Sequence, residues 1–230
     1  MRLSPSLKLG LIAFLAVDLA LALILGSLYI LRADLRLKDE LRDIGATIYE
    51  EAFVINNFKL LDQDANLFTL DDLRGDWNLI FFGFTSCPDI CPITMSELKR
   101  FADAWFEAGQ KKEVNVILAT VDPNNDDPSS MKEYLGEFNS SFLGLTGTQA
   151  ELKGLAESLF VGFGESMSTE VLAATAHDGH SKELGAARFS IDHSSHISVI
   201  NPEAELFAVI RPPHRAHDLV QALELIIEKY

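Results

Sequence analysis

The most reactive side chains in this sequence belong to its only two cysteines, Cys87 and Cys91, in the segment Cys-Pro-Asp-Ile-Cys-Pro. In a helical turn, residues four positions apart share one face, with Cβ atoms about 5–6 Å apart. That spacing suits a metal chelate and, after a small local adjustment, a disulfide bond. Pro88 and Pro92 stiffen the segment, because proline fixes its own φ and biases the preceding residue away from the α region. The residues alone leave open a metal site, a disulfide bond or two free thiols.

A position at the start of a helix would favour thiolates, because the helix dipole lowers thiol pKa values. Thiolates are soft ligands that select Cu(I), zinc or iron–sulfur clusters over hard cations. Two sulfur atoms are too few for most structural zinc or cluster sites, so an imidazole from elsewhere in the chain would be the natural third ligand. The pair cannot staple a whole domain, and a domain of this size buries a core without disulfide bonds.

The surrounding sequence predicts an α/β domain. Residues 77–84 form an unbroken apolar run typical of a strand buried on both faces, and a helix with a 3.6-residue apolar period follows the cysteines. The other expected elements are a hairpin of 58–61 with 67–70, strands over 114–121, 189–191, 197–200 and 206–210, helices over 128–138, 148–159 and 214–228, and a long mobile loop over 164–187. This order predicts a parallel sheet finished by antiparallel strands. The cysteines then lie at the carboxyl end of its first central strand, where open α/β sheets place their sites.

An apolar run of 23 residues covers positions 9–31, with Asp18 as its single charge. At about 1.5 Å per residue, a helix of this length crosses a hydrocarbon core of roughly 30 Å. A cleaved signal peptide would have an apolar region of about 7–15 residues with a small-residue cleavage site after it, whereas Ala20-Leu21-Ala22 lies inside the run. We therefore predict a retained transmembrane anchor over residues 1–32, a charged linker over 33–52 and a soluble domain over 53–230.

The chain is acidic, with 34 Asp and Glu against 19 Lys and Arg and a formal net charge of −15. A field of this sign repels phosphate backbones, and no basic stripe interrupts it, so nucleic acid is not expected as a partner. Arg2 and Lys8 precede the apolar run, and four Lys or Arg residues follow it at positions 32, 36, 38 and 42. By count alone, these charges would place the domain in the cytoplasm.

The cysteine segment is also the first of a series of motifs. These are Phe82-Gly-Phe-Thr-Ser-Cys-Pro-Asp-Ile-Cys-Pro92, Val121-Asp-Pro123, Gly144-Leu-Thr-Gly147, and Asp192-His193 with Pro202 nine residues beyond that histidine. Over about residues 53–230 the series resembles the SCO/SenC family. The resemblance implies a thioredoxin-like central sheet with flanking helices and an N-terminal β-hairpin, preceded by one transmembrane helix. It also implies one copper ion per chain, Cu(I) or Cu(II), bound by two cysteines and one histidine.

Carried onto this sequence, the resemblance assigns Cys87 and Cys91 as the sulfur ligands, which form a disulfide when oxidised, and His193 as the nitrogen ligand. His196 competes with His193, but positions i and i+3 of a strand face opposite ways, and the spacing to Pro202 selects His193. Asp122 matches a carboxylate that the family keeps near the site, although an aspartate there could equally start a turn.

Other polar residues near these motifs have simpler interpretations. Asp89 is expected to be the N-cap of the helix that carries Cys91. The pair His177 and His180 lies in the long loop, either as an accessory copper-acquisition patch or as part of a solvated loop. The pair His214 and His217 opens the closing helix and is expected on the surface.

Members of the family supply copper to, or reduce thiols of, the dinuclear copper centre of cytochrome c oxidase subunit II. The resemblance therefore predicts a metallochaperone, which is not an enzyme, for that subunit or another copper-protein client. The alternative is a thiol–disulfide oxidoreductase that acts on client cysteines through Cys87 and Cys91. A thioredoxin would carry CxxC spacing and need no distal histidine, and a purely structural membrane-tethered module would leave the cysteine–proline segment unexplained.

The family also bears on the cellular location. Its members act on the periplasmic or intermembrane-space side, because the oxidase copper site faces the outer compartment, and this overrides the charge count. We expect a single-pass protein of the bacterial inner membrane, with the N-terminus inside and residues 33–230 in the periplasm.

Overall fold

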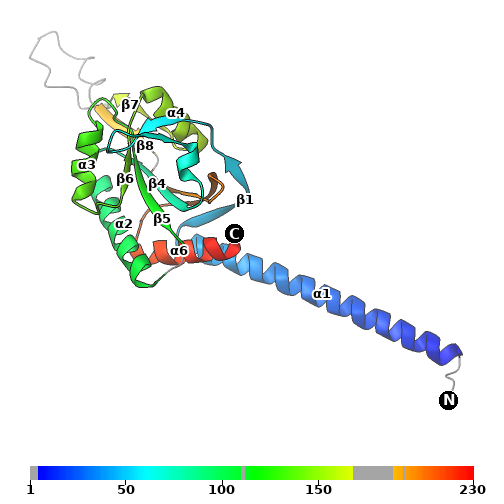
Figure 1. Cartoon of the computed structure of the whole chain (residues 1–230). Coiled ribbons are helices and arrows are strands. Elements are labelled where there is room, and N and C mark those ends of the chain that lie inside the picture. Colours follow the sequence, from blue (N-terminus) through cyan, green and yellow to red (C-terminus); the bar gives the residue numbers. More distant parts are fainter. Residues whose placement is uncertain (1–4, 110–111, 168–188, 194) are drawn as a thin grey trace, which may run out of the picture. The chain divides into compact units, whose positions relative to one another are not determined.

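The first part of the molecule is a single long helix. The structure, a computed structural model, describes residues 5–109, 112–167, 189–193 and 195–230, with backbone alone for 5–8, 10–13, 16, 33, 163–167 and 189–193. The chain divides into two compact units, one that ends at Asp43 and one from Ile44 to Tyr230 (Figure 1). The first unit consists of helix α1 (Pro5–Asp43), which is 39 residues long.

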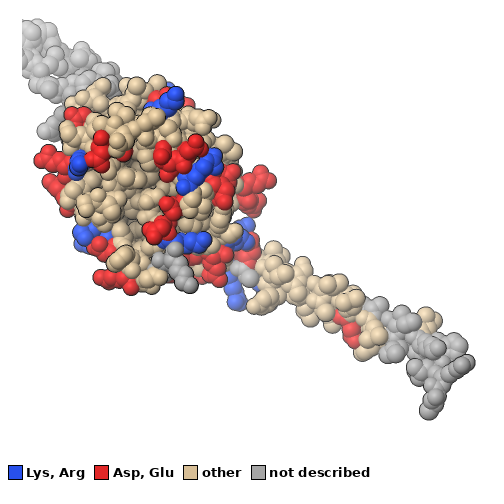
Figure 2. Space-filling view, in the orientation of Figure 1, with Lys and Arg blue, Asp and Glu red and all other residues tan. Residues whose placement is uncertain are grey.

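Helix α1 has an apolar part and a charged part. Large apolar side chains such as Leu23 and Ile30 are exposed, and Figure 2 shows long stretches of the helix surface without charge. Toward its carboxyl end, Lys38 pairs with Asp34 at 3.2 Å. None of the helices in the described part of the chain meets the length and apolarity that a membrane span requires.

The second unit begins with strand β1 (Ala46–Val54), so residues 46–52 belong to a sheet and not to the predicted linker. The helix-forming linker sequence continues α1 only to Asp43, because Gly45 turns the chain at a φ of +78°. A Cβ atom there would also lie 2.9 Å from the carbonyl oxygen of Arg211, so only glycine fits. Glu50 and Glu51 are exposed on β1, which is an edge strand, and edge strands tolerate charged side chains. These charges made the segment look like a linker in the sequence.

A six-stranded sheet forms the centre of the second unit, in the order β1–β10–β9–β4–β5–β6 (Figure 1). Strands β4 (Trp77–Gly83), β5 (Val114–Thr120) and β6 (Leu143–Leu145) run parallel. Strands β9 (Ile197–Ile200), β10 (Glu205–Ile210) and β1 are antiparallel to their neighbours. The parallel sheet finished by antiparallel strands is thus confirmed.

Helices connect the parallel strands and close the chain. Helix α2 (Ile90–Glu107) links β4 to β5, and α3 (Pro128–Gly136) links β5 to β6. Helix α4 (Gln149–Ser158) follows β6, and α6 (Ala216–Lys229) is the last element. The predicted cap at Thr148 is present, because its hydroxyl accepts the amide of Glu151 at 3.3 Å.

The core of this unit lies on both faces of the sheet. Alternate residues of β4 point to opposite faces. Ile80 and Phe82 belong to one cluster with residues of α4 and of the predicted hairpin, β2 (Lys59–Leu61) with β3 (Leu67–Thr69). On the other face the ring of Phe81 lies 6.4 Å from that of His214, just before α6. All seven residues of β4 are buried, as its unbroken apolar run predicts.

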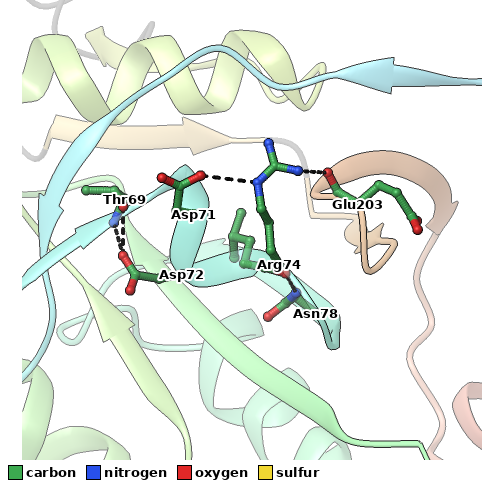
Figure 3. A network of polar contacts seen from close by, with 7 residues as sticks. Thr69, Asp71, Asp72, Arg74, Asn78 and Glu203 are labelled. Atoms are coloured by element: carbon green, nitrogen blue, oxygen red, sulfur yellow. Dashed lines mark hydrogen bonds and ion pairs between the residues drawn. The ribbon is translucent and has the colours of Figure 1, made fainter.

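A polar network anchors the amino end of β4 (Figure 3). From the turn after the short 3-10 helix η1 (Leu70–Leu73), Arg74 donates to the carboxylate of Asp71 at 3.1 Å and to the backbone carbonyl of Glu203 at 2.8 Å. Asn78 donates to the backbone carbonyl of Leu73 at 2.8 Å. Strand residues rise about 3.3 Å each, so these contacts lie roughly 20 Å along the strand from the cysteine end. They stabilise the scaffold and do not take part in the site.

A second, two-stranded sheet pairs β7 (Phe163–Met167) antiparallel with β8 (Phe189–His193). The loop predicted over 164–187 is therefore wrong for residues 164–167, because ladder pairing outweighs the weak strand propensity of this Gly- and Ser-containing segment. The strand predicted over 189–191 is confirmed and continues to His193. The pair His177 and His180 lies outside the described residues.

Candidate metal centre

The two cysteines lie just past the carboxyl end of β4, where the sequence predicts them. Strand β4 ends at Gly83, Cys87 lies in the connecting loop, and Cys91 is the second residue of α2. The Cys87 amide donates to the carbonyl of Phe84 at 3.2 Å, which holds the loop in a tight turn. Cys91 is fully buried, Cys87 is half-buried, and both are free thiols. Cys87 is therefore the more accessible member of a reduced pair.

Gly83 makes room for the sulfur atom of Cys91. A Cβ atom at residue 83 would lie 2.9 Å from Cys91 Sγ and 3.1 Å from side-chain carbons of Leu118 and Phe81. Only a glycine at the end of β4 therefore lets the buried thiol occupy its position beside the strand. Steric fit beside the Cys91 sulfur therefore explains why the Phe-Gly-Phe-Thr segment has a glycine at position 83.

The buried thiol of Cys91 is held in its protonated form. Burial raises the pKa of Cys91 to about 12, and a hydrogen bond with the Cys87 thiol and the charges of Cys87 and Asp126 act in the same direction. A backbone hydrogen bond from Phe84 opposes them. The prediction that the helix start lowers the thiol pKa is thus wrong for Cys91, because burial outweighs the helix dipole.

A buried carboxylate, Asp126, ties the loop to the ends of the parallel strands. It accepts hydrogen bonds from the Thr85 amide at 3.1 Å, the Thr85 hydroxyl at 2.5 Å and the Thr120 hydroxyl at 2.5 Å. Its backbone carbonyl accepts from the hydroxyl of Thr146 at 2.6 Å. These three threonines stand at or just after the ends of β4, β5 and β6, and Thr85 is two residues from Cys87. Asp126 therefore holds the start of the cysteine loop against the carboxyl ends of the parallel strands.

Sequence reasoning chose a different aspartate. Asp122 starts a turn, since its carboxylate accepts from the Asn125 side chain at 2.8 Å and its carbonyl from the amide of Asp126 at 2.9 Å. Asp89 occupies the N-cap position of α2 as predicted, but its side chain makes no capping hydrogen bond. The sequence feature that could have indicated Asp126 is a threonine at or just after the end of each parallel strand, because three such hydroxyls near one another need an acceptor.

Tyr134 of α3 is a second residue that the sequence did not reveal. Its hydroxyl is buried without a hydrogen-bond partner among the described residues. Burial raises its pKa, and the nearby Cys91 and Cys87 side chains act in the same direction, so the phenol stays protonated. Tyr134 is thus a neutral side chain whose hydroxyl interacts electrostatically with the cysteine pair.

The register of the sheet brings the segment before β9 to the cysteine edge. Strand β9 is antiparallel to β4, with Ile197 opposite Phe81. His193 precedes Ile197 by four residues, and Cys87 follows Phe81 by six, so both segments leave the sheet at the same edge. His193 is the last residue of β8 and pairs with Phe163, and its backbone is described without its side chain.

The other histidines have separate roles. His193 ends β8 and His196 lies in the connection before β9, so they do not share one strand as the prediction assumed. His196 Nε2 lies 3.3 Å from the carbonyl oxygen of Leu159. The surface position predicted for His214 is wrong, because its ring is buried against Phe81. His217 is exposed as predicted and lies 2.8 Å from the Asp218 carboxylate.

The described cysteines supply two soft ligands. Among the side chains that the structure describes, no three His, Cys, Asp or Glu residues form a group that could hold a metal ion. The predicted third ligand, the imidazole of His193, lies outside that set of side chains. Two neighbouring sulfurs, one buried and one half-buried, suit a thiophilic ion better than hard cations, which prefer oxygen ligands.

A sequence model described as SCO1/SenC matches residues 46–228. The chain belongs to the SCO1/SenC family. The SCO2-like protein of Rickettsia felis is 35% identical over 146 residues, which cover 63% of this chain and 70% of that protein. The predicted family is thereby confirmed.

Solved structures agree in fold. The copper-bound ScoI of Arabidopsis thaliana is 26% identical, with a TM-score of 0.64, and the match covers 77% of this chain and 99% of that one. Copper-bound yeast Sco1 is 27% identical, also with a TM-score of 0.64, over 77% of this chain and 90% of that one. The predicted α/β fold with a central mixed sheet and flanking helices is confirmed.

Proposed function

We infer that this SCO1/SenC protein carries one copper ion on Cys87, Cys91 and His193. The observation that carries the proposal is the reduced thiol pair at the sheet edge toward which the segment of His193 also runs. The copper-bound relatives of the same fold support the choice of metal. Two thiolates and one imidazole form a low-coordinate soft site that suits Cu(I).

Loading of such a site is coupled to proton release. Thiolate is the metal-binding form, whereas Cys91 is a protonated thiol with a pKa of about 12. The incoming ion must therefore displace the proton of Cys91, after first contact at the more exposed Cys87. Copper affinity should rise with pH, because each thiol proton competes with the ion.

Copper stoichiometry tests the ligand set. The reduced chain should bind one Cu(I); Cys87→Ser or Cys91→Ser should abolish tight binding, and His193→Ala should weaken it and alter the Cu(II) spectrum. Cys87→Ser and Cys91→Ser each keep one sulfur ligand at most. The difference in copper affinity between either variant and the parent therefore measures the contribution of the second sulfur. Undiminished binding by His193→Ala, measured by competition with a chelator of known affinity, would remove this histidine from the site.

The proposed client is the dinuclear copper centre of cytochrome c oxidase subunit II, or another copper protein in the same compartment. The exposed apolar residues of α1 between Leu9 and Leu31 support a membrane anchor that keeps the carrier near a membrane client. We propose that the domain lies in the periplasm, and the family resemblance supports this proposal. Reporter fusions after Tyr230 test this location. Alkaline phosphatase, which needs export, should be active. An inactive phosphatase together with a fluorescent fusion that matures only in the cytoplasm would show the opposite orientation.

A second candidate, a thiol–disulfide oxidoreductase, is favoured by the two free thiols four residues apart at the start of α2. Cys87 and Cys91 could give two electrons and two protons to a client disulfide, which becomes a dithiol while they form a disulfide. Oxidation would also abolish copper binding, because a disulfide is not a thiolate ligand. Equal copper binding before and after complete oxidation, with the disulfide confirmed by mass, would contradict this coupling.

A further inference from the structure

Two histidines outside the proposed ligand set fix the chain directly after His193. Strand β8 ends at His193 and β9 begins at Ile197, so three residues connect the small hairpin to the main sheet. The hairpin shares no strand with the six-stranded sheet. The position of His193 therefore depends on how this connection is held.

His196 closes the base of the hairpin. Its Nε2 atom lies 3.3 Å from the carbonyl oxygen of Leu159, the C-cap residue of α4. Leu159 precedes the first residue of β7 by four positions, so the contact joins the chain that enters the hairpin to the chain that leaves it. A carbonyl oxygen only accepts, so Nε2 of His196 carries the hydrogen.

His214 holds the same connection from the side of α6. Its Nε2 atom lies 2.7 Å from the carbonyl oxygen of Ser195 and therefore also donates. Its ring is buried against Phe81, and Nδ1 has no partner among the described residues. Burial lowers the pKa of both His196 and His214, which keeps the two rings neutral. Neither nitrogen that donates is free to bind a metal.

We propose that His196 and His214 are positioning residues that clasp residues 195–196 and thereby set where β8 presents His193 to the cysteine pair. The two contacts act on opposite sides of one short connection, so loss of either lets the end of β8 move. This role rests on the proposed copper site, although the clasp itself exists without metal. Residues that orient a metal ligand typically change metal affinity about 10–100-fold when removed.

Copper binding by the full chain tests the proposal. His196→Ala and His214→Ala should each weaken Cu(II) binding about 10–100-fold and broaden the nitrogen hyperfine signal of the electron paramagnetic resonance spectrum. The sulfur-to-copper absorption should remain, because both cysteines are intact. Glutamine, whose side-chain NH₂ can replace Nε2–H, should restore most of the affinity. His217→Ala is the matched control, because His217 is an exposed histidine near the start of α6, three residues after His214.

A second arm separates positioning from ligation. In a His193→Ala background, His196→Ala should cause no further loss of copper affinity, because the clasp acts only through His193. A further loss there would make His196 a ligand and overturn the proposal. If an alanine variant fails to fold, the glutamine variant decides, since it keeps the donor and should match the parent spectrum.

A metal-free readout keeps the two proposals distinguishable. Amide hydrogen exchange in residues 189–193 of the metal-free chain should become roughly five- to tenfold faster in His196→Ala and His214→Ala, and stay unchanged in His217→Ala. A parent chain that binds no copper would refute the proposed function while this measurement still tests the clasp. Unchanged exchange in both variants would overturn the clasp.

Discussion

Replacement of Gly83 by alanine is the smallest change that should disturb the cysteine site from outside it. Gly83 ends β4, and its φ is not in the left-handed region, so alanine meets no backbone strain there. The effect is purely steric, since the new methyl carbon would lie 2.9 Å from Cys91 Sγ. Leu118 and Phe81 contact the same position at 3.1 Å and limit any retreat in their direction.

The size of the displacement follows from these distances. Ordinary contact begins at about 3.4 Å, so Cys91 Sγ must move by at least roughly 0.5 Å. A cysteine has one χ angle and Cys91 is fully buried, so the shift must be taken up by helix α2 or by an unfavourable rotamer. Overpacking of this kind costs about 1–3 kcal/mol of folding free energy. Metal–ligand distances tolerate only about 0.2 Å, so the chelate should suffer more than the fold.

Chemical unfolding and chelator competition measure the two effects on one preparation. Gly83→Ala should lower the unfolding free energy by about 1–3 kcal/mol and weaken Cu(I) binding at least about tenfold. Gly154→Ala is the control: a Cβ atom at this position in α4 meets nothing within 4 Å, so the variant should be as stable as the parent or more stable. If Gly83→Ala matched the parent in both measurements, the contact between Gly83 and the thiol would not constrain the site.

Three further predictions concern charge and protonation. Asp126→Asn should cost about 2–4 kcal/mol of stability, because the hydroxyls of Thr85 and Thr120 lose their carboxylate acceptor. It should also shift the pH profile of Cys91 alkylation to lower pH, because the charge of Asp126 helps to raise the pKa of that thiol. Asp122→Asn should change neither the stability nor the alkylation profile. At pH 8, iodoacetamide should label Cys87 before Cys91, since Cys91 is buried and its pKa is raised to about 12; equal labelling rates in peptide mass spectrometry would contradict this. Burial lowers the pKa of His214 below its unfolded value of about 6.5, so stability should be complete above pH 6.5 and fall as pH drops through the folded pKa. His214→Gln should flatten that decline in urea midpoints between pH 7.5 and 5, and a parent profile without decline would refute the assignment.

The parts of the fold that could be predicted are those encoded by local pattern. The apolar run of β4 has no polar residue on either face except Asn78, which is buried and hydrogen-bonded, so its burial in the middle of a sheet was readable. The helix that carries Cys91 was readable from its 3.6-residue period. Within that period Phe106 is 86% exposed while its neighbour Trp105 is buried, because adjacent helix residues point about 100° apart and only one can face the core.

The parts that could not be predicted depend on contacts between distant segments. Strand β1 has exposed charges because it is an edge strand, and only pairing with β10 identifies it as a strand. Asp126 collects donors from three strand ends that are far apart in sequence, so no local motif contains it. His214 is buried by the way the chain turns into α6, which its polar surroundings in the sequence do not show.

The two halves of the proposed site differ in how firmly the fold holds them, and this difference suits a carrier. Cys91 lies in α2, and Cys87 lies in the loop that Asp126 and its threonine partners join to the ends of the central strands. His193 ends a hairpin outside that sheet, and two imidazole–carbonyl contacts control its approach. In the proposed site the cysteines would hold the ion from the central scaffold, and His193 would hold it from the separate pair of strands β7 and β8. If the proposed function holds, the strength of the clasp at His196 and His214 would set how readily copper is handed over.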